Sequence, residues 1–191
     1  MTTDFAKYTR HLPLIFGLVV GLCFVTFQIL GFNLSYLPGD LGDTRLNIYF
    51  LEHAHQYFFT DNVPTEGYWN APFIYPQESI ITFSDNLLGT FLIYSFFRFL
   101  NCDIYLAFQW WMIVITFLNY YFAYLFLNYI IKNRFAAVLG AFIFAFSIAL
   151  AEQYVHPQTY PRFCIPIAFL FAARFYNSFK AKEFFWMVFF V

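Results

Sequence analysis

The sequence predicts an all-α fold, a polytopic transmembrane helix bundle with two interfacial helices in its first outer loop. Hydrophobic residues make up 61% of the chain and charged residues only 11%, which is too apolar for a soluble domain of 191 residues. Phenylalanine alone accounts for 31 residues. Several apolar runs approach the roughly 20 residues that cross a bilayer, and the polar residues collect between these runs.

Charge and cysteine content narrow the class of protein further. The net charge of −1 gives no electrostatic basis for binding nucleic acid. Cys23, Cys102 and Cys164 are far apart in the sequence, so they form neither a disulfide framework nor a metal-binding spacing. We therefore expect the lipid bilayer, and no nucleic acid, among the partners of this chain.

The first apolar run, 12–32, predicts a membrane span that is retained as an anchor, because it lacks a small-residue cleavage site. Lys7, Arg10 and His11 precede this run and place the N-terminus in the cytoplasm. A further apolar run starts at 184 and is still shorter than a span at residue 191. We therefore expect residues 1–191 to be the N-terminal part of one transmembrane domain, with the rest of the protein missing.

The segment 33–85 is polar and acidic and carries a single Lys or Arg, which fits a loop outside the cell. Within it, residues 43–59 follow a helical period with one apolar face. Asp43 and Asn47 lie in the middle of that face, and Glu52 lies on the opposite one. The pattern predicts a helix lying flat against the membrane or the bundle, with Asp43 facing inward and Glu52 facing water.

The later apolar runs are assigned by their flanking charges. Lys132 and Arg134 reach the cytoplasmic side only if the run 86–100 does not cross the membrane. At about 1.5 Å per residue this run extends ~22 Å, short of the ~30 Å hydrocarbon core, so we predict a second interfacial helix there. The remaining spans are then predicted at 104–131, 135–151 and 161–177.

Small residues recur at every fourth position within 135–151. This spacing places them on one face of a helix and lets a neighbouring helix approach closely. The pattern predicts a packing face inside the bundle, formed by Ala137, Ala141, Ala145 and Ala149.

Two carboxylates, Asp40 and Asp43, follow the first span directly. A charged side chain beside a bilayer must be in water, paired with an opposite charge or part of a functional site. The simplest interpretation is that Asp43 caps the helix that begins there. A second is a divalent ion held by Asp40 and Asp43, because oxygen ligands suit Mg²⁺ or Mn²⁺. His53 and His55 diverge by about 200° on a helix and cannot share an ion.

Several short motifs resemble the GT-C class of glycosyltransferases, the polytopic enzymes that use polyprenyl-phosphate sugars. Residues 42–45, Gly-Asp-Thr-Arg, resemble the acidic start of the first interfacial helix in that class, and 70–76 resembles its proline-containing segment. The run 86–100 resembles its second interfacial helix, and 134–141 resembles its basic, alanine-rich turn. Bacterial aminoarabinose transferases and protein mannosyltransferases are the most similar in pattern. Gly42 stands where they carry a first acid, which leaves Asp40 as the substitute.

The resemblance implies a transferase that moves a sugar from a polyprenyl-phosphate donor to an acceptor at the outer face of a bacterial inner membrane. It implies that Asp43 is the catalytic carboxylate, with Asp40 as its helper. An acceptor hydroxyl is a weak nucleophile, so a carboxylate takes or orients its proton. The leaving lipid phosphate needs positive or hydrogen-bonding groups. The predicted substrate-binding residues are Arg162, His156, Gln158, Asn47 and Asp85.

A transport protein or a non-catalytic membrane protein is the alternative. A transporter places polar residues at mid-membrane on broken helices. In this chain the predicted spans are nearly free of charge and the polar groups gather on one side, which favours chemistry at the membrane surface. Asp85 has an alternative role of its own, as the cap of the helix predicted at 86–100.

Overall fold

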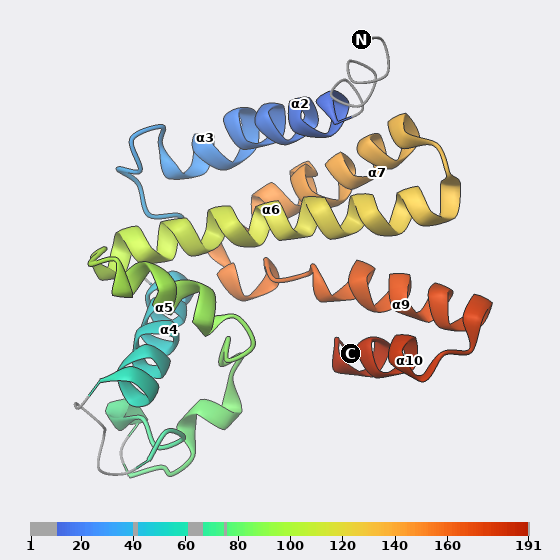
Figure 1. The fold of residues 1–191 in the computed structure, drawn as a ribbon. Helices are drawn as coiled ribbons and strands as arrows, with labels where there is room; N and C mark the ends of the chain where they lie inside the picture. Colours follow the sequence, from blue (N-terminus) through green and yellow to red (C-terminus); the bar gives the residue numbers. More distant parts are fainter. Residues whose placement is uncertain (1–10, 40–41, 61–66, 75, 191) are drawn as a thin grey trace.

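The computed structural model describes residues 11–39, 42–60, 67–74 and 76–190, and across these residues the fold is helical throughout, with no strand. Figure 1 shows the long helices running back and forth along α6, with a smaller group of helices and loops at one end. The α-helices are α2 (Leu12–Gly21), α3 (Phe27–Leu30), α4 (Asp43–Phe59), α5 (Phe91–Phe99), α6 (Ile104–Ile131), α7 (Arg134–Phe146), α8 (Ile148–Ala151), α9 (Cys164–Ser178) and α10 (Ala181–Phe189). Shorter turns are the π-helical η1 (Leu22–Thr26) and the 3₁₀ segments η2 (Pro72–Ile74), η3 (Ile80–Phe83), η4 (Glu152–Val155) and η5 (Pro157–Thr159).

Two helical stretches of the described chain are long and apolar enough to cross a membrane, Leu12–Leu30 and Ile104–Ile131. The first joins α2 to α3 through the π-helical turn η1. It ends two residues before the predicted limit of 32, because Gly31 turns the chain with a φ of +76°.

The third predicted span, 135–151, is not one helix. Ser147 has an extended backbone, with a ψ of 148°, and this breaks the run into α7 and α8. The next helix, α9, begins at Cys164 and not at 161, because two short 3₁₀ turns and an irregular stretch precede it. These two apolar helices are therefore shorter than the sequence pattern suggested.

The core of the bundle lies around α6. Its N-terminus is capped by Asp103, whose side chain accepts hydrogen bonds from the backbone N–H groups of Tyr105 and Leu106. Trp111 and Ile115 are fully buried on this helix. The position of α6 between the other helices explains why its residues are buried on several sides.

The alanine row packs as predicted over most of its length. Ala137, Ala141 and Ala145 are buried on α7, where they allow close contact with α6 and α2. Ala149 lies beyond the break at Ser147 and is exposed. The break in the helix rotates this last alanine out of the row.

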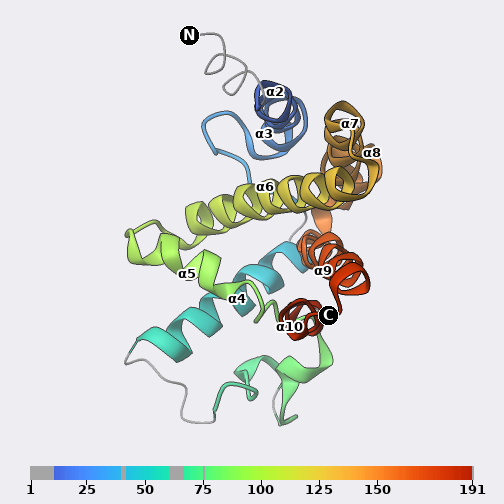
Figure 2. The ribbon, with the colours of Figure 1, turned by 45° about the vertical axis from the view of Figure 1, so that its right-hand side comes forward.

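Helix α4 covers the same residues, 43–59, as the amphipathic helix that the sequence predicts. It runs across the direction of α6 at one end of the bundle and is followed by the irregular segment that leads to α5 (Figures 1 and 2). The predicted helix at 86–100 is shorter, because Leu87 has a φ of +53° and α5 begins only at Phe91. Thr90, and not Asp85, occupies the N-cap position, so the predicted capping role of Asp85 is wrong.

Part of the polar face of α4 is not in water, which corrects a second expectation. Helix α5 covers the region around Glu52, whose side chain is only 15% exposed, whereas Arg45 and Gln56 on the same face stay exposed. His55 is buried beside Glu52. The sequence period identified the two faces of α4 but could not show that the polar face has its own partner helix.

The described lysines and most of the described carboxylates lie at opposite ends of the bundle, whereas Arg45 and Arg98, on α4 and α5, lie with the carboxylates. The turns α6–α7 and α9–α10 lie at the same end as the start of α2 (Figure 1), and they carry Lys132, Arg134, Lys180 and Lys182. Among the described carboxylates only Glu183 lies at this end. The other described carboxylates lie at the opposite end: Asp43, Glu52, Glu78, Asp85, Asp103 and Glu152.

Candidate functional site

Asp43 is the first residue of α4, and Gly42 precedes it at the N-cap position. The Oδ2 atom of Asp43 lies 2.5 Å from Nδ1 of His156 and 3.2 Å from Nε2 of Gln158. These partners come from a loop more than a hundred positions later in the sequence. The carboxylate therefore joins the segment after the first apolar helix to the loop between α8 and α9.

Asn47 completes this group one helical turn along α4. Its Nδ2 atom donates to the Oε1 atom of Gln158 and to the backbone oxygen of Asp43, each at 2.8 Å. Asn47 is 3% exposed. We call Asp43, Asn47, His156 and Gln158 the Asp43 cluster. These are four of the seven residues that the sequence singled out for a site, and the fold brings them together.

The 152–162 loop presents His156 between two 3₁₀ turns. The backbone N–H of His156 donates to the oxygen of Gln153 at 2.8 Å, which closes the first turn. The backbone oxygen of His156 then accepts from the N–H and hydroxyl of Thr159 at 3.0 and 2.8 Å. Both polar backbone groups of His156 are thus satisfied locally, and its ring is left to reach Asp43.

A buried amide in α6 fixes the end of the same loop, and sequence reasoning missed it. Nδ2 of Asn119 donates to the backbone oxygen of Tyr160 at 2.8 Å, and its Oδ1 accepts from the N–H of Arg162 at 3.1 Å. Asn119 is fully buried. The available signal was an uncharged amide in the middle of a 28-residue apolar helix, where a polar group needs a partner.

Side-chain bonds also fasten the segment before Asp43. Gln109 of α6 donates to the backbone oxygens of Leu34 and Tyr36 at 2.9 and 2.7 Å. The hydroxyl of Thr44 donates to the oxygen of Pro38 at 2.7 Å. The start of α4, which carries Asp43, is therefore held against the bundle by polar contacts.

The electrostatics of the cluster favour an ionised carboxylate. Hydrogen bonds from His156, and then from Gln158, hold the pKa of Asp43 below its usual range. The side chains of Asp43 and His156 are 41% and 48% exposed, so the pair is open to solvent. An exposed, negatively charged group with a histidine on one oxygen can orient or accept a proton from a bound molecule.

Arg162 lies apart from this cluster. Its guanidinium stacks over the ring of Phe144, 5.4 Å from the ring centre, and Nη2 reaches the backbone oxygen of Phe144 at 3.4 Å. Among the described residues no carboxylate forms an ion pair with it. Arg162 therefore carries a positive charge on the side of the loop that faces α7.

Asp85 lies on an open pocket of about 390 Å³ between the 84–90 turn and the 152–162 loop. Gln158 lines the same pocket together with Pro161 and Cys164. Because Gln158 also contacts Asp43, this pocket adjoins the Asp43 cluster. It has room for a small polar ligand beside the carboxylate.

The described residues do not form a metal-binding site of the kind that the sequence suggested. Asp40 lies outside the described residues. Oδ2 of Asp43 contacts hydrogen-bond donors of Gln158 and His156, which does not suit binding of a hard cation there. No group of three or more His, Cys, Asp or Glu side chains in the described residues is placed to hold a metal ion.

A second polar group, between α4 and α5, also escaped sequence reasoning. Arg98 donates from Nε and Nη2 to the two carboxylate oxygens of Glu52, at 2.9 and 3.1 Å, and Tyr94 donates to Oε2 at 2.6 Å. Burial disfavours the charge on Glu52, but the hydrogen bonds of Tyr94 and Arg98 outweigh it and lower the pKa of Glu52. Arg98 also donates to the backbone oxygen of Cys102 at 2.6 Å.

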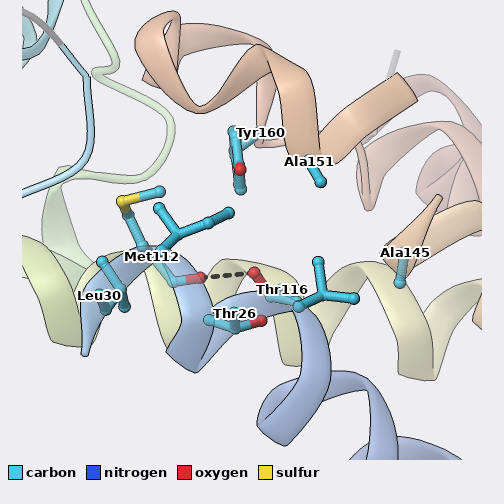
Figure 3. A pocket seen from close by; sticks show the side chains of 9 residues that line it. Thr26, Leu30, Met112, Thr116, Ala145, Ala151 and Tyr160 are labelled. Carbon is cyan, nitrogen blue, oxygen red and sulfur yellow. Dashed lines mark hydrogen bonds between the residues drawn. The ribbon is translucent and has the colours of Figure 1, made fainter. Parts of the chain in front are cut away.

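A small enclosed cavity lies inside the bundle, between η1, α6 and Tyr160 (Figure 3). Its volume is about 10 Å³, and Thr26 and Thr116 contribute hydroxyl groups to its lining. The Thr116 hydroxyl donates to the backbone oxygen of Met112. A space of this size holds one water molecule at most, so it is not a substrate site.

No protein family, no characterised protein and no solved structure matches this chain. The function must therefore be argued from the arrangement of its own residues.

Proposed function

We propose that this chain belongs to an integral membrane glycosyltransferase, which moves a sugar from a polyprenyl-phosphate donor to an acceptor at the outer membrane face. The observation that supports this most is the Asp43 cluster. Its carboxylate, at the start of α4, and its histidine, in the 152–162 loop, meet at one end of an apolar bundle and are open to solvent. The sequence resemblance to GT-C enzymes places an acid at the same point, directly after the first span.

The distribution of charge supports a multi-pass arrangement in a bacterial inner membrane, with the N-terminus in the cytoplasm. The cationic turns next to Lys132 and Lys180 lie at the end where the chain starts (Figure 1). Cytoplasmic loops of membrane proteins are enriched in such residues. The Asp43 cluster then lies at the outer face, and α4 runs across the bundle as an interfacial helix does.

The chemistry proposed for the site is substitution at the anomeric carbon of the sugar. The Asp43 cluster handles the proton of the acceptor hydroxyl, and the adjoining pocket lined by Asp85 and Gln158 receives a sugar hydroxyl or the acceptor. Arg162 is the unpaired cation of the 152–162 loop. We assign it to the lipid phosphate, whose negative charge grows as the bond to the sugar breaks.

The arrangement of polar groups in α6 does not favour a transport protein. Gln109 and Asn119 donate to backbone oxygens of the neighbouring loops, and Thr116 donates to its own helix. These groups are used to hold the fold together. They do not line a polar path across the bundle.

Asp43→Asn in the full-length protein tests the function. We expect a folded protein whose transfer rate falls by roughly 10²–10⁴, because Asn keeps the shape of Asp but not its charge. Asp40→Asn is expected to be intermediate. The assay follows sugar transfer in membranes from a panel of synthetic polyprenyl-phosphate hexoses, with Glu78→Gln as the control carboxylate. Absence of transfer by the wild-type protein from every donor, or an unchanged rate in Asp43→Asn, contradicts the proposal.

The topology has a separate test. Cys102 lies in the turn between α5 and α6 and is predicted to react with a membrane-impermeant thiol reagent in intact cells. The protein should carry Cys23→Ser and Cys164→Ser so that Cys102 is the one thiol left within residues 1–191. Labelling that requires permeabilised cells places this turn in the cytoplasm and refutes the orientation.

A further inference from the structure

We propose that the Nε2 atom of His156 takes the proton of the acceptor hydroxyl, and that Asp43 is a positioning residue for the imidazole ring. This inference rests on the proposed transferase function and assigns the roles within the same site. It differs from the sequence-based expectation, in which Asp43 was itself the base.

The hydrogen bond between His156 and Asp43 fixes which ring nitrogen carries the proton. Nδ1 of His156 faces Oδ2 of Asp43 at 2.5 Å. An ionised carboxylate only accepts hydrogen bonds, so Nδ1 must carry a proton to make this contact favourable. In a neutral imidazole the lone pair is then on Nε2, at the other side of the ring. The contact with Asp43 therefore selects the tautomer that can accept a proton.

Asp43 itself is poorly suited to be the base. Its Oδ2 atom already has two donors, His156 and Gln158, and Gln158 is held in place by Asn47. These hydrogen bonds also lower the pKa of the Asp43 carboxyl. Both donors stabilise the negative charge of this carboxylate and so make it a weaker proton acceptor.

The imidazole ring of His156 is accessible to a bound acceptor. The side chain of His156 is 48% exposed, so one side of the ring remains open after Nδ1 has bound Asp43. Gln158, two residues later, lines the open pocket of about 390 Å³. A hydroxyl group of a bound acceptor can approach the exposed imidazole from solvent without displacing the carboxylate.

The proposed step exchanges one bond at the anomeric carbon for another. The acceptor oxygen forms a bond to the anomeric carbon, and the bond from that carbon to the phosphate oxygen breaks, with its electron pair remaining on the lipid phosphate. The proton of the acceptor passes to Nε2 of His156. The resulting imidazolium is stabilised by the negative charge of Asp43 and later returns the proton to water.

The roles are tested by sugar transfer in membranes containing the full-length protein, with the polyprenyl-phosphate hexose that the wild type uses. We expect His156→Ala to lower the rate by roughly 10²–10⁴. Added imidazole should restore part of this loss with a saturable concentration dependence, because the substitution leaves a solvent-open space. Adding Asp43→Asn to His156→Ala should cause little further loss, since the two residues act as a unit. Glu152→Gln, an exposed carboxylate of the same loop, is the control.

Some results overturn the assignment of roles without touching the proposed function. If the wild type is active, but imidazole gives no rescue and Asp43→Asn is much more damaging than His156→Ala, then Asp43 is the base. If the wild type transfers no sugar, the proposed function itself fails.

A substrate-free measurement tests the positioning role directly. In protein labelled with ¹⁵N at histidine, the chemical shifts of the two ring nitrogens report which one carries the proton, and His156→Gln identifies the signals. We expect the Nδ1–H form in the wild type and a shift towards the other tautomer in Asp43→Asn. A dominant Nε2–H form in the wild type at neutral pH refutes the inference.

Discussion

The ion pair between Glu52 and Arg98 gives a quantitative test of how α4 is held on the bundle. Arg98→Met keeps an unbranched apolar stem but removes the guanidinium, and with it both hydrogen bonds to the carboxylate and the bond to Cys102. Glu52 then keeps its charge at a position where its side chain is only 15% exposed. The variant should therefore be less stable than the wild type.

The structure places the size of this effect between two limits. Exposed ion pairs contribute about 0–1 kcal/mol, and removing one partner of a buried pair costs about 3–5 kcal/mol. With Arg98 24% and Glu52 15% exposed, the pair lies between these cases. We expect a loss of about 2 kcal/mol. For a chain of this size, that corresponds to a fall of about 4–8 °C in the melting temperature.

The assay is thermal unfolding of the purified protein in detergent, followed by tryptophan fluorescence. A double-mutant cycle with Glu52→Gln and Arg98→Met isolates the pair from the separate contact of Arg98 with Cys102. Arg45→Met is the matched control. Arg45 is an exposed cation on α4, the helix that carries Glu52. A coupling energy below about 0.5 kcal/mol, or an equal loss in the control, would show that this pair does not secure α4.

Three other substitutions probe stability. The lowered pKa of Glu52 means that its contribution is complete above its unfolded value of about 4.3 and is lost as the pH falls through the folded value, so the melting temperatures of the wild type and Glu52→Gln should converge only below about pH 4. Asn119→Leu leaves two backbone groups of the 152–162 loop without their partner and should lower the unfolding free energy by about 2–3 kcal/mol, whereas a near-neutral effect in denaturant unfolding would contradict the anchoring role. Gly21→Ala would bring a methyl group into steric overlap with the buried ring of Phe146 and should cost about 1–3 kcal/mol, whereas Gly89→Ala meets nothing within 4 Å. Equal melting temperatures for the two variants would refute this account.

The sequence predicted the helical class and the limits of two elements, because both depend on local patterns. The periodicity of 43–59 and the long apolar run of 104–131 coincide with α4 and α6. The face of 43–59 that carries Asp43 and Asn47, together with the resemblance to GT-C enzymes, also identified Asp43, Asn47, His156 and Gln158 as candidates. A pattern of this kind marks which residues are unusual in their surroundings, but it does not show which of them meet.

The tertiary structure alone decided the partners. The pairing of Asp43 with His156 joins residues more than a hundred positions apart, and no local period encodes such a contact. Helix α5 covers the part of α4 around Glu52, and Arg98 compensates the charge there, so that a residue expected to face water is largely buried. Asn119 anchors a loop that sequence reasoning treated as independent of α6. In each case the burial of a polar group depends on a distant partner, so its role emerges only when the chain has folded.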